Sequence, residues 1–383
     1  MKRNKPPARA QARNQSKILA APPAPPAAVA ALPAGAVKSA GIRPITSMTE
    51  DELAQLFKSW REPAFRATQL RDFLFRQGVS SMEGITNLSK ALRERLSREA
   101  PLYELQFSET SEGDDATKWL WKGTDGALIE SVQIRTPDRV TSCVSSQVGC
   151  AMGCVFCASG LGGLERHLQA HEILEQYLQM WGRSGLRSSH VVFMGMGEPL
   201  HNYDEVIKSI RMLNSPPPKG AGVGARRITI STVGIVPGIY KLSEEQLQIE
   251  LAISLHAPDE ETRRKLIPAA KRFPIREIMT ATEEYCRKTR RIVTYEYVLL
   301  AGVNDSGEQA GELASLLRNH PCKVNLIPFN PVKETPYERP SLEAQERFKD
   351  ILERAHIPCT IRYSKGKAVD AACGQLRRRV TEV

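Results

Sequence analysis

Three cysteines stand close together in the stretch SSQVGCAMGCVFCASG, which covers residues 145–160. Cys150, Cys154 and Cys157 follow the spacing CxxxCxxC, and a fourth cysteine, Cys143, lies seven residues before the first of them. Thiolates at this spacing in a loop can bind one soft metal centre, either zinc or an iron-sulfur cluster. The residue types therefore predict a metal centre held by three thiolates.

The spacing favours an iron-sulfur cluster over structural zinc. A structural zinc site usually takes four ligands in two separated pairs, whereas this chain has one group of three cysteines and no second pair. The alternative is Cys143 as a fourth zinc ligand, although the β-branched residues around it predict a strand rather than a loop. Three ligands on a four-iron cluster leave one iron open, which suits a reactive centre.

The cysteines follow the first of six β-branched segments, each of which precedes a helical pattern. The strands are expected at residues 140–146, 190–195, 227–232, 249–256, 293–300 and 323–330. The helices are expected at residues 170–181, 203–213, 237–247, 275–288, 306–319 and 342–355. Such alternation is typical of parallel βαβ units, so we predict an α/β fold with an incomplete, TIM-like (β/α)6 barrel.

The segments on either side of this barrel differ from it in composition. Residues 1–47 are predicted to be a disordered basic tail, because the first 49 residues contain eight Lys and Arg, no Asp or Glu, and a Pro/Ala tract. Residues 48–100 show helical patterns whose basic side chains can contact RNA or simply face solvent. We expect a short β extension at 101–137, the barrel at 138–365, and a C-terminal loop at 366–383.

Composition limits the classes of partner. The net charge is +10, of which the tail contributes eight, so the tail suits a polyanion such as RNA, although an organellar transit peptide has a similar composition. No apolar run approaches the roughly 18–20 residues of a membrane span. The scattered cysteines fit a reducing cytoplasm rather than a secreted disulfide framework. We therefore expect a cytoplasmic protein without a membrane partner, and nothing indicates an oligomer rather than a monomer.

The cysteine motif, with Phe156 before its last cysteine, resembles the signature of radical S-adenosylmethionine (SAM) enzymes. Six stretches also occur in the order seen in the RlmN family of 23S rRNA and tRNA adenine methyltransferases. They are CVSSQVGCAMGCVFCASG, VVFMGMGEPL, RRITISTVGIVPGI, LAISLHAP, VNLIPFNP and DAACGQL. The resemblance extends from about residue 65 to residue 376, and thus leaves out the Pro/Ala tail.

The resemblance implies a radical SAM barrel with two cofactors. Cys150, Cys154 and Cys157 would ligate a [4Fe-4S] cluster, and its open iron would bind S-adenosylmethionine. The positions that match the family's SAM-binding residues are Gly197, Glu198, Ser231, Ser254, Leu255, His256 and Asn330. Without the resemblance, most of these residues would be interpreted as ordinary polar or glycine residues at strand ends, not as cofactor ligands. The implied partners are 23S rRNA or tRNA as substrate and an external, flavodoxin-like electron donor.

The resemblance also implies a methylated cysteine as an intermediate. Carbon 2 of adenine is electron-poor, so it cannot attack a sulfonium methyl group as an ordinary nucleophile does. In the family scheme, one SAM methylates Cys373, and a second gives a 5′-deoxyadenosyl radical that activates the new methyl group for addition to the base. Glu130 then removes a proton, and Cys143 forms a disulfide with Cys373 to release the product. Without the resemblance, Glu130 would be interpreted as an ordinary strand carboxylate and Cys373 as a free cysteine.

Two other functions stay open at this point. Related chloramphenicol-florfenicol resistance enzymes methylate carbon 8 of the same adenine with the same cysteines, although the stretch at residues 65–78 favours carbon 2. A zinc-stabilised RNA-binding protein without catalytic activity is the alternative from another class. Residues 158–173 depart from the wording STGKQGFNRNLT of many family members, which leaves both rRNA and tRNA open as substrates.

The remaining cysteines and one histidine pair carry no assigned chemistry. His167 and His171 have helical i, i+4 spacing but lack a third ligand, so we expect surface or packing roles. Cys286, Cys322 and Cys359 are expected to be structural.

Overall fold

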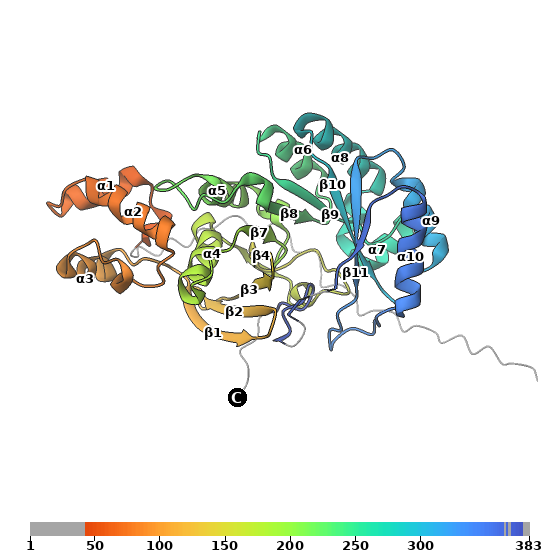
Figure 1. The fold of residues 1–383 in the computed structure, drawn as a ribbon, viewed down its shortest axis with the longest axis horizontal. Coiled ribbons are helices and arrows are strands. Elements are labelled where there is room, and N and C mark those ends of the chain that lie inside the picture. Colours follow the sequence, from red (N-terminus) through yellow and green to blue (C-terminus); the bar gives the residue numbers. More distant parts are fainter. Residues whose placement is uncertain (1–42, 364, 367–368, 378–383) are drawn as a thin grey trace, which may run out of the picture. The chain divides into compact units, whose positions relative to one another are not determined.

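The computed structural model describes residues 43–363, 365–366 and 369–377, all within one compact unit that spans Ala40–Val383. In this described part, ten strands form one mixed sheet in the order β1-β2-β3-β4-β7-β8-β9-β10-β11-β12 (Figure 1). A hairpin of β5 and β6 forms a separate two-stranded sheet. The chain is therefore an α/β protein with both antiparallel and parallel strands.

The antiparallel half of the sheet comes first in the chain. Its strands are β1 (Gln106–Glu112), β2 (Ala116–Lys122), β3 (Leu128–Thr136) and β4 (Arg139–Cys143). In the register of β3 and β4, Val132 lies opposite Cys143, so Glu130 lies two residues away on the same face of the sheet. This half of the sheet thus brings two predicted catalytic residues onto neighbouring strands.

The parallel half of the sheet continues from β4. Its further strands are β7 (His190–Phe193), β8 (Ile228–Thr232), β9 (Glu250–Ser254), β10 (Val293–Leu299), β11 (Cys322–Pro328) and β12 (Cys359–Ile361). Neighbouring strands in this half are parallel throughout. Their carboxyl ends therefore share one edge of the sheet. Within the described residues, β1 and β12 each pair with one neighbour, so the sheet is open at both ends.

Helices alternate with the parallel strands (Figure 1). They are α4 (Ala170–Ser184), α5 (Tyr203–Asn214), α6 (Val236–Glu244), α7 (Glu260–Leu266), α8 (Ile275–Thr289), α9 (Gly307–Leu316) and α10 (Leu342–Arg354). Polar side chains cap several helix starts; Asp259, for example, accepts from the backbone N of Thr262 in α7 at 2.8 Å. Short 3-10 turns add η3 (Ala158–Gly160), η4 (Pro199–Asn202), η5 (Ala225–Arg227) and η6 (Pro268–Arg272).

A small helical module precedes the sheet. It contains η1 (Ile45–Ser47), α1 (Glu50–Ser59), α2 (Phe65–Gln77), η2 (Met82–Gly84) and α3 (Lys90–Glu99). Arg71 in α2 is buried and donates to the backbone carbonyls of Met48, Pro218 and Lys219 at 2.8–3.2 Å. This basic side chain therefore joins the module to the segment after α5 and is not free to contact RNA, which corrects the expectation for that residue.

The predicted boundary of the tail, residue 47, lies too late in the chain. Ile45 is fully buried and Thr46 donates a hydrogen bond to the buried Glu175 of α4, so the segment before residue 48 is part of the folded unit. An apolar side chain and a buried acceptor hold it there, and neither is visible in the composition of the tail. The rest of the predicted tail, residues 1–42, lies outside the described residues.

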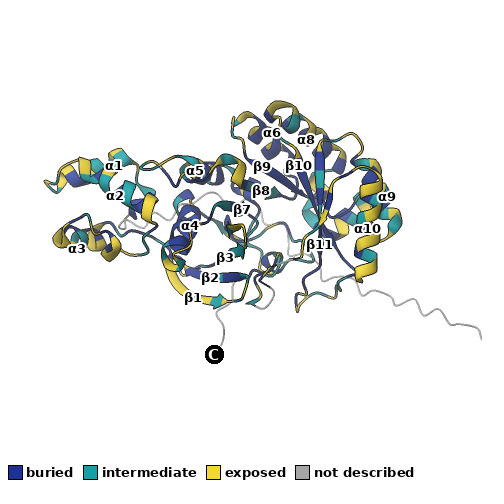
Figure 2. Ribbon diagram, in the orientation of Figure 1, coloured by how far each residue is buried: buried dark blue, intermediate teal, exposed yellow. Residues whose placement is uncertain are grey.

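The six predicted barrel strands and their helices are present, whereas four short elements were not predicted. These are β5 (Gln147–Gly149) with β6 (Leu164–His167), the seven-residue helix α7, and β12. Segments this short show too little periodicity to be recognised. All seven residues of β10, in the middle of the parallel half, are buried (Figure 2). None of the helices in the described residues is long and apolar enough to cross a membrane.

Candidate active site

The three clustered cysteines lie in a loop between β5 and β6, and we call residues 150–157 the cysteine loop. The backbone N of Cys150 donates to the carbonyl oxygen of Gly163 at 2.9 Å, which closes the loop at its base. The backbone N of Val155 donates to the carbonyl of Leu266, at the end of α7, at 3.0 Å. Both the hairpin and α7 therefore fix the conformation of this loop.

Burial raises the pKa of all three thiols, to about 12 for Cys150 and well above the ordinary value for Cys154. The negative forms of Cys150 and Cys157 raise the pKa of Cys154 further, which shows that the sulfur atoms are close enough to interact. A metal centre would reverse this effect, because bound cations drive protons off coordinating thiols.

The donor set fits a [4Fe-4S] cluster. Soft thiolates are the ligands that iron-sulfur clusters use, and each cysteine binds a different iron, so the three sulfur atoms need not surround one point. Over the described residues, no three His, Cys, Asp or Glu side chains are grouped to hold a single metal ion.

The turn after β7 is shaped by Gly197 and Glu198. Gly197 has φ +103°, and a Cβ there would lie only 2.6 Å from the Cβ of Gln147, so no larger residue fits. The Glu198 carboxylate accepts from the backbone N of Leu200 at 3.0 Å and of Val233 at 2.8 Å. Burial raises its pKa to about 7. Glu198 thus ties the carboxyl ends of β7 and β8 together.

The next two strand ends bring Ser231 and Ser254 together, with their Oγ atoms 3.3 Å apart. Leu255 follows and is fully buried. His256 has φ +62°, and its Nδ1 accepts from the backbone N of Val298 at 3.0 Å. Burial lowers the pKa of His256 to about 3, so the imidazole is neutral. Three of these four side chains therefore offer neutral polar groups at one edge of the sheet.

Two contacts connect these strand ends to the cysteines. The His256 ring packs edge-on against Phe156 of the cysteine loop, with ring centroids 4.9 Å apart. Asn330, after β11, is buried and donates from Nδ2 to the carbonyl oxygen of Cys373 at 3.2 Å. The predicted cofactor residues thus contact both predicted cysteine segments.

The segment of residues 369–377 carries Cys373, and we call it the C-terminal loop. It packs on the residues that follow the cysteine loop: the backbone N of Ala158 donates to the carbonyl of Gly374 at 2.7 Å. Ser159 Oγ donates to the carbonyl of Leu376, also at 2.7 Å. These bonds join segments more than 200 positions apart in the sequence.

The segments that carry Cys143 and Cys373 pack against each other. Cys143, at the end of β4, packs in an apolar cluster with Val132, Ala371 and Leu376. Burial, with a smaller contribution from Cys373, raises the pKa of Cys143 to about 12. Cys373 is exposed to solvent, yet surrounding protein atoms raise its pKa as well. This combination describes an accessible thiol with protein on most of its sides.

All eight cysteines are free thiols. The Cys143–Cys373 disulfide implied by the resemblance is therefore not formed in this structure, and the fold does not depend on it. The physical reason is that hydrogen bonds and apolar contacts already hold the C-terminal loop in place.

Glu130 connects β3 to the C-terminal loop. Its buried carboxylate has Oε1 3.2 Å from Nζ of Lys118, and Oε2 accepts from the backbone N of Arg377 at 2.7 Å. Burial raises the pKa of Glu130, while Lys118 and the amide of Arg377 act in the opposite direction. The structure thus brings Glu130, Cys143 and Cys373 together beside the cysteine loop.

Two residues at the site were not predicted. Gln147 accepts from the backbone N of Glu198 at 2.8 Å, and its Nε2 lies 2.9 Å from Nδ1 of His167 and 3.3 Å from Nδ1 of His201. No pattern in the sequence distinguishes this glutamine. Lys118 could have been found, because alternate residues of two paired strands share one face.

The other candidate residues lie elsewhere. His171 Nε2 is 2.7 Å from Oε2 of Glu104, so it forms an ion pair or hydrogen bond rather than a pair with His167. Cys286, Cys322 and Cys359 lie in α8, β11 and β12.

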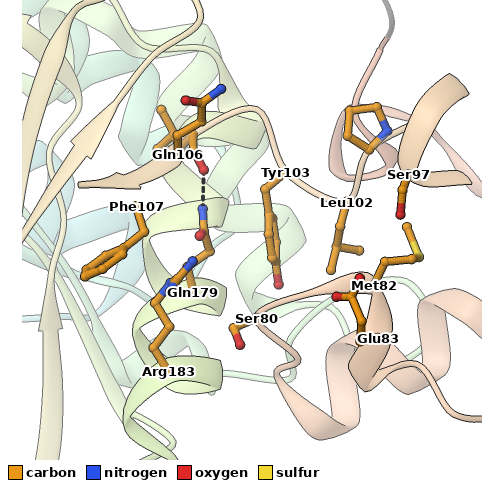
Figure 3. A pocket seen from close by; sticks show the side chains of 12 residues that line it. Ser80, Met82, Glu83, Ser97, Leu102, Tyr103, Gln106, Phe107, Gln179 and Arg183 are labelled. Carbon is orange, nitrogen blue, oxygen red and sulfur yellow. Dashed lines mark hydrogen bonds between the residues drawn. The ribbon is translucent and has the colours of Figure 1, made fainter. Parts of the chain in front are cut away.

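A hollow of about 390 Å³ opens between the helical module, β1 and α4 (Figure 3). Its lining includes Ser80, Tyr103, Phe107 and Arg183, and the Arg183 guanidinium lies 4.3 Å from the centre of the Phe107 ring. It contains none of the predicted site residues, so it is separate from the site formed by the cysteines.

Two family models match the chain. The Radical SAM superfamily matches residues 144–314, which contain the cysteine loop and the strand ends up to β10. The ribosomal RNA large subunit methyltransferase N-terminal domain matches residues 44–102, the helical module. Radical SAM enzymes use a [4Fe-4S] cluster and S-adenosylmethionine, and these are the cofactors of this chain.

Full-length relatives and a solved structure agree with these matches. A probable dual-specificity RNA methyltransferase RlmN of Symbiobacterium thermophilum is 48% identical over 88% of this chain and 92% of its own length. The corresponding protein of Picosynechococcus sp. is 46% identical over 85% of this chain and 93% of its own length. The crystal structure of a radical SAM methyltransferase from Sphaerobacter thermophilus has a TM-score of 0.83 at 43% identity, over 88% of this chain and 99% of that one.

These matches exclude the non-catalytic RNA-binding alternative, because similarity extends through both the helical module and the cysteine-bearing sheet. The chain belongs to the RlmN family of radical SAM RNA methyltransferases.

Proposed function

We propose that this enzyme methylates carbon 2 of an adenine in 23S rRNA, in tRNA, or in both, with the methyl group carried on Cys373. The observation that best supports this is the double attachment of the C-terminal loop. Gly374 bonds to Ala158 beside the cysteine loop, and Arg377 bonds to Glu130. The segment of the proposed methyl carrier is therefore joined both to the proposed cluster site and to the proposed base.

We expect Cys150, Cys154 and Cys157 to hold the cluster. The proposed SAM-binding residues are Gly197, Glu198, Ser231, Ser254, Leu255, His256 and Asn330. When bound, the cluster and two molecules of S-adenosylmethionine per turnover supply the methyl group and the one-electron chemistry that an electron-poor ring carbon requires, with electrons from an external, flavodoxin-like donor.

Glu130 is the proposed general base, which removes the proton from carbon 2 after the new carbon–carbon bond has formed. A base is most effective when its pKa lies near the working pH, and burial raises the pKa of Glu130 in that direction. Lys118, 3.2 Å away, favours the ionised form that must be present before the proton is taken. Burial and Lys118 thus shift the pKa of Glu130 in opposite directions.

Cys143 is the proposed resolving thiol. Its thiolate attacks the sulfur of Cys373, and the bond from that sulfur to the product carbon breaks. The electron pair of this bond stays on the carbon, which takes up a proton to complete the methyl group, and a disulfide forms as the methylated base leaves. An external reductant must then restore both thiols.

The test is an anaerobic assay with the full chain. The cluster is reconstituted, the enzyme is incubated with S-adenosylmethionine, a reductant and unmodified 23S rRNA or tRNA, and the digested nucleosides are identified by mass spectrometry. We expect 2-methyladenosine. Detection of 8-methyladenosine would assign the chain to the resistance-type reaction, and no methylated base despite an intact cluster would overturn the proposed substrate.

Cysteine variants sharpen this assay. Cys373→Ala should abolish methylation while iron and sulfide content stay normal, because the methyl carrier is lost and the cluster ligands are not. Cys286→Ala, in α8 outside the site, is the matched control and should remain active. Equal activity of both variants would contradict the role of Cys373.

A further inference from the structure

Arg263 in α7 is a buried cation without a carboxylate bonded to it. Its side chain is fully inaccessible, and its two terminal nitrogens donate to the carbonyl oxygens of Val233 at 2.5 Å and Phe273 at 3.1 Å. Its Nε has no hydrogen-bond partner among the described residues. Glu260, one turn earlier, attracts it only from a distance. Moving an uncompensated charge out of water costs several kcal/mol, so an anion is expected nearby.

Besides Glu260, the cysteine loop is the anionic candidate that interacts with Arg263. Leu266, three residues after Arg263, accepts the backbone hydrogen bond from Val155, which is the neighbour of Cys154. Met152 and Leu266 also belong to one apolar cluster, against which Cys150 and Cys154 pack. The end of α7 therefore forms a wall of the proposed cluster site.

The electrostatic interactions of Arg263 also connect it to the cysteine loop. Burial lowers the pKa of Arg263 to about 10, and the ionised form of Cys154 raises it. The same guanidinium lowers the pKa of Cys154, and it also lowers the pKa of His256, the ring that packs on the cysteine loop. Arg263 thus interacts with two residues at the site without bonding to either.

We propose that Arg263 is a positioning residue that serves as the counter-ion of the iron-sulfur cluster and raises its reduction potential. A cluster ligated by three thiolates is anionic, and one-electron reduction adds a further negative charge. A fixed, desolvated cation therefore stabilises the reduced cluster more than the oxidised one. The proposal rests on the proposed ligand set of Cys150, Cys154 and Cys157 but is independent of the adenine carbon that is methylated.

The test is an anaerobic redox titration of the reconstituted full chain, followed by the EPR signal of the reduced cluster. Arg263→Gln removes the charge and keeps one donor for the Val233 carbonyl, whereas Arg263→Lys keeps the charge. The matched control is Arg264→Gln, because Arg264 is the next residue of α7 and its side chain is 47% exposed. All proteins are compared at equal iron and sulfide content.

The expected result is a lower reduction potential in Arg263→Gln only. A tenfold loss in the equilibrium constant of reduction corresponds to about 59 mV for one electron, and we expect at least this shift. Arg263→Lys should keep most of the wild-type potential and Arg264→Gln all of it. An unchanged potential in Arg263→Gln overturns the proposal, and so does an equal loss in Arg263→Lys, since the charge would then not be responsible.

Thermal unfolding gives a second, independent readout. As a counter-ion, Arg263 costs stability in the cluster-free protein and gains it when the cluster binds, so Arg263→Gln should reduce the rise in Tm that the cluster causes. A purely structural role would lower both Tm values equally and would overturn the proposal. If Arg263→Gln does not assemble a cluster, its cluster-free Tm decides: a value at or above wild type supports the proposal, and a lower value contradicts it.

The two proposals fail in different ways. A wild-type protein without a [4Fe-4S] signal would overturn both the proposed ligand set and the role of Arg263. A normal wild-type signal with no effect of Arg263→Gln would overturn only the latter.

Discussion

Two buried glutamates in different regions of the molecule are held in different ways. Glu175 in α4 accepts from the consecutive backbone nitrogens of Glu104 and Leu105 at 2.8–3.0 Å and from the hydroxyl of Thr46. Glu130 at the candidate site has one oxygen near the ammonium group of Lys118, and the other accepts a single amide.

The difference distinguishes a structural carboxylate from the proposed general base. The acceptors of Glu175 are filled by the backbone of its own neighbourhood, so the carboxylate joins η1, the start of β1 and α4. Glu130 instead contacts the flexible side chain of Lys118 and the backbone of the loop that carries Cys373. Equal burial of the two carboxylates therefore does not imply equal roles, and their replacement should have opposite consequences.

The largest expected effect is on catalysis at Glu130. Glu130→Gln should lower the methylation rate about 10²–10⁴-fold, the usual contribution of a general base, while Tm stays close to wild type because the amide oxygen still accepts from Arg377. Since the proton is removed after the carbon bond forms, enzyme and RNA should remain covalently joined, which a denaturing gel detects. Glu112→Gln, an exposed carboxylate in β1, is the control. A normal rate in Glu130→Gln would remove Glu130 from the mechanism.

The next effect is on stability at Glu175. Glu175→Ala should lower the free energy of unfolding by about 2–5 kcal/mol, because each buried donor left without an acceptor costs about 1–3 kcal/mol. Denaturant titration measures this loss, and methylation per folded molecule should be unchanged. Glu94→Ala, in an exposed pair with Lys90, should change stability by less than about 0.5 kcal/mol. Similar losses in both variants would contradict the role of the Glu175 hydrogen bonds.

The pH dependence of stability should also follow Glu175. Burial raises its pKa from the ordinary 4.5 to about 7, so the folded protein binds this proton more tightly than the unfolded chain does. The resulting stabilisation is complete below about pH 4.5 and is lost as the pH rises through about 7. Between pH 5 and 8, wild type should therefore lose roughly 1–3 kcal/mol more than Glu175→Gln. If the stability curves of the two proteins run parallel, Glu175 is not the group responsible for this pH dependence.

The smallest expected effect concerns Lys118, which acts through Glu130. Lys118→Met removes the neighbouring charge that lowers the pKa of Glu130, so the rise of the methylation rate with pH should move to higher pH by up to roughly one unit. Lys118→Arg should restore the wild-type profile. Lys122→Met, an exposed residue of the same strand, is the control, and a shift of equal size there would show that the effect is not local.

Much of the fold could be predicted because its strands are β-branched runs that alternate with amphipathic helices. The cysteine spacing and the glycine turn at Gly197 are also local signals. The hairpin β5-β6 and helix α7 could not be recognised, since segments of three to seven residues have no measurable period.

Contacts between segments far apart in the sequence are harder to predict than the elements themselves. The pair Pro137-Asp138 forms a two-residue connection between β3 and β4. This connection fixes the register in which Val132 lies opposite Cys143 and Glu130 lies two residues away on the same face. That signal was available in the sequence. By contrast, Arg71 and Arg263 each occur among other charged residues, so nothing in their neighbourhood indicates that they are buried. Burial of a charged residue is decided by the segments that pack on it.

The attachment of the C-terminal loop has a consequence for biosynthesis. Ribosomes add residues from the N-terminus, so every helix and strand described here is made before Cys373 emerges. Ala158 and Glu130 must therefore wait for Gly374 and Arg377 before their hydrogen bonds can form. A chain interrupted before this loop would have its cysteine loop but no methyl carrier. Translation order thus completes the site last, so a nascent or truncated enzyme cannot carry the proposed methyl group to RNA.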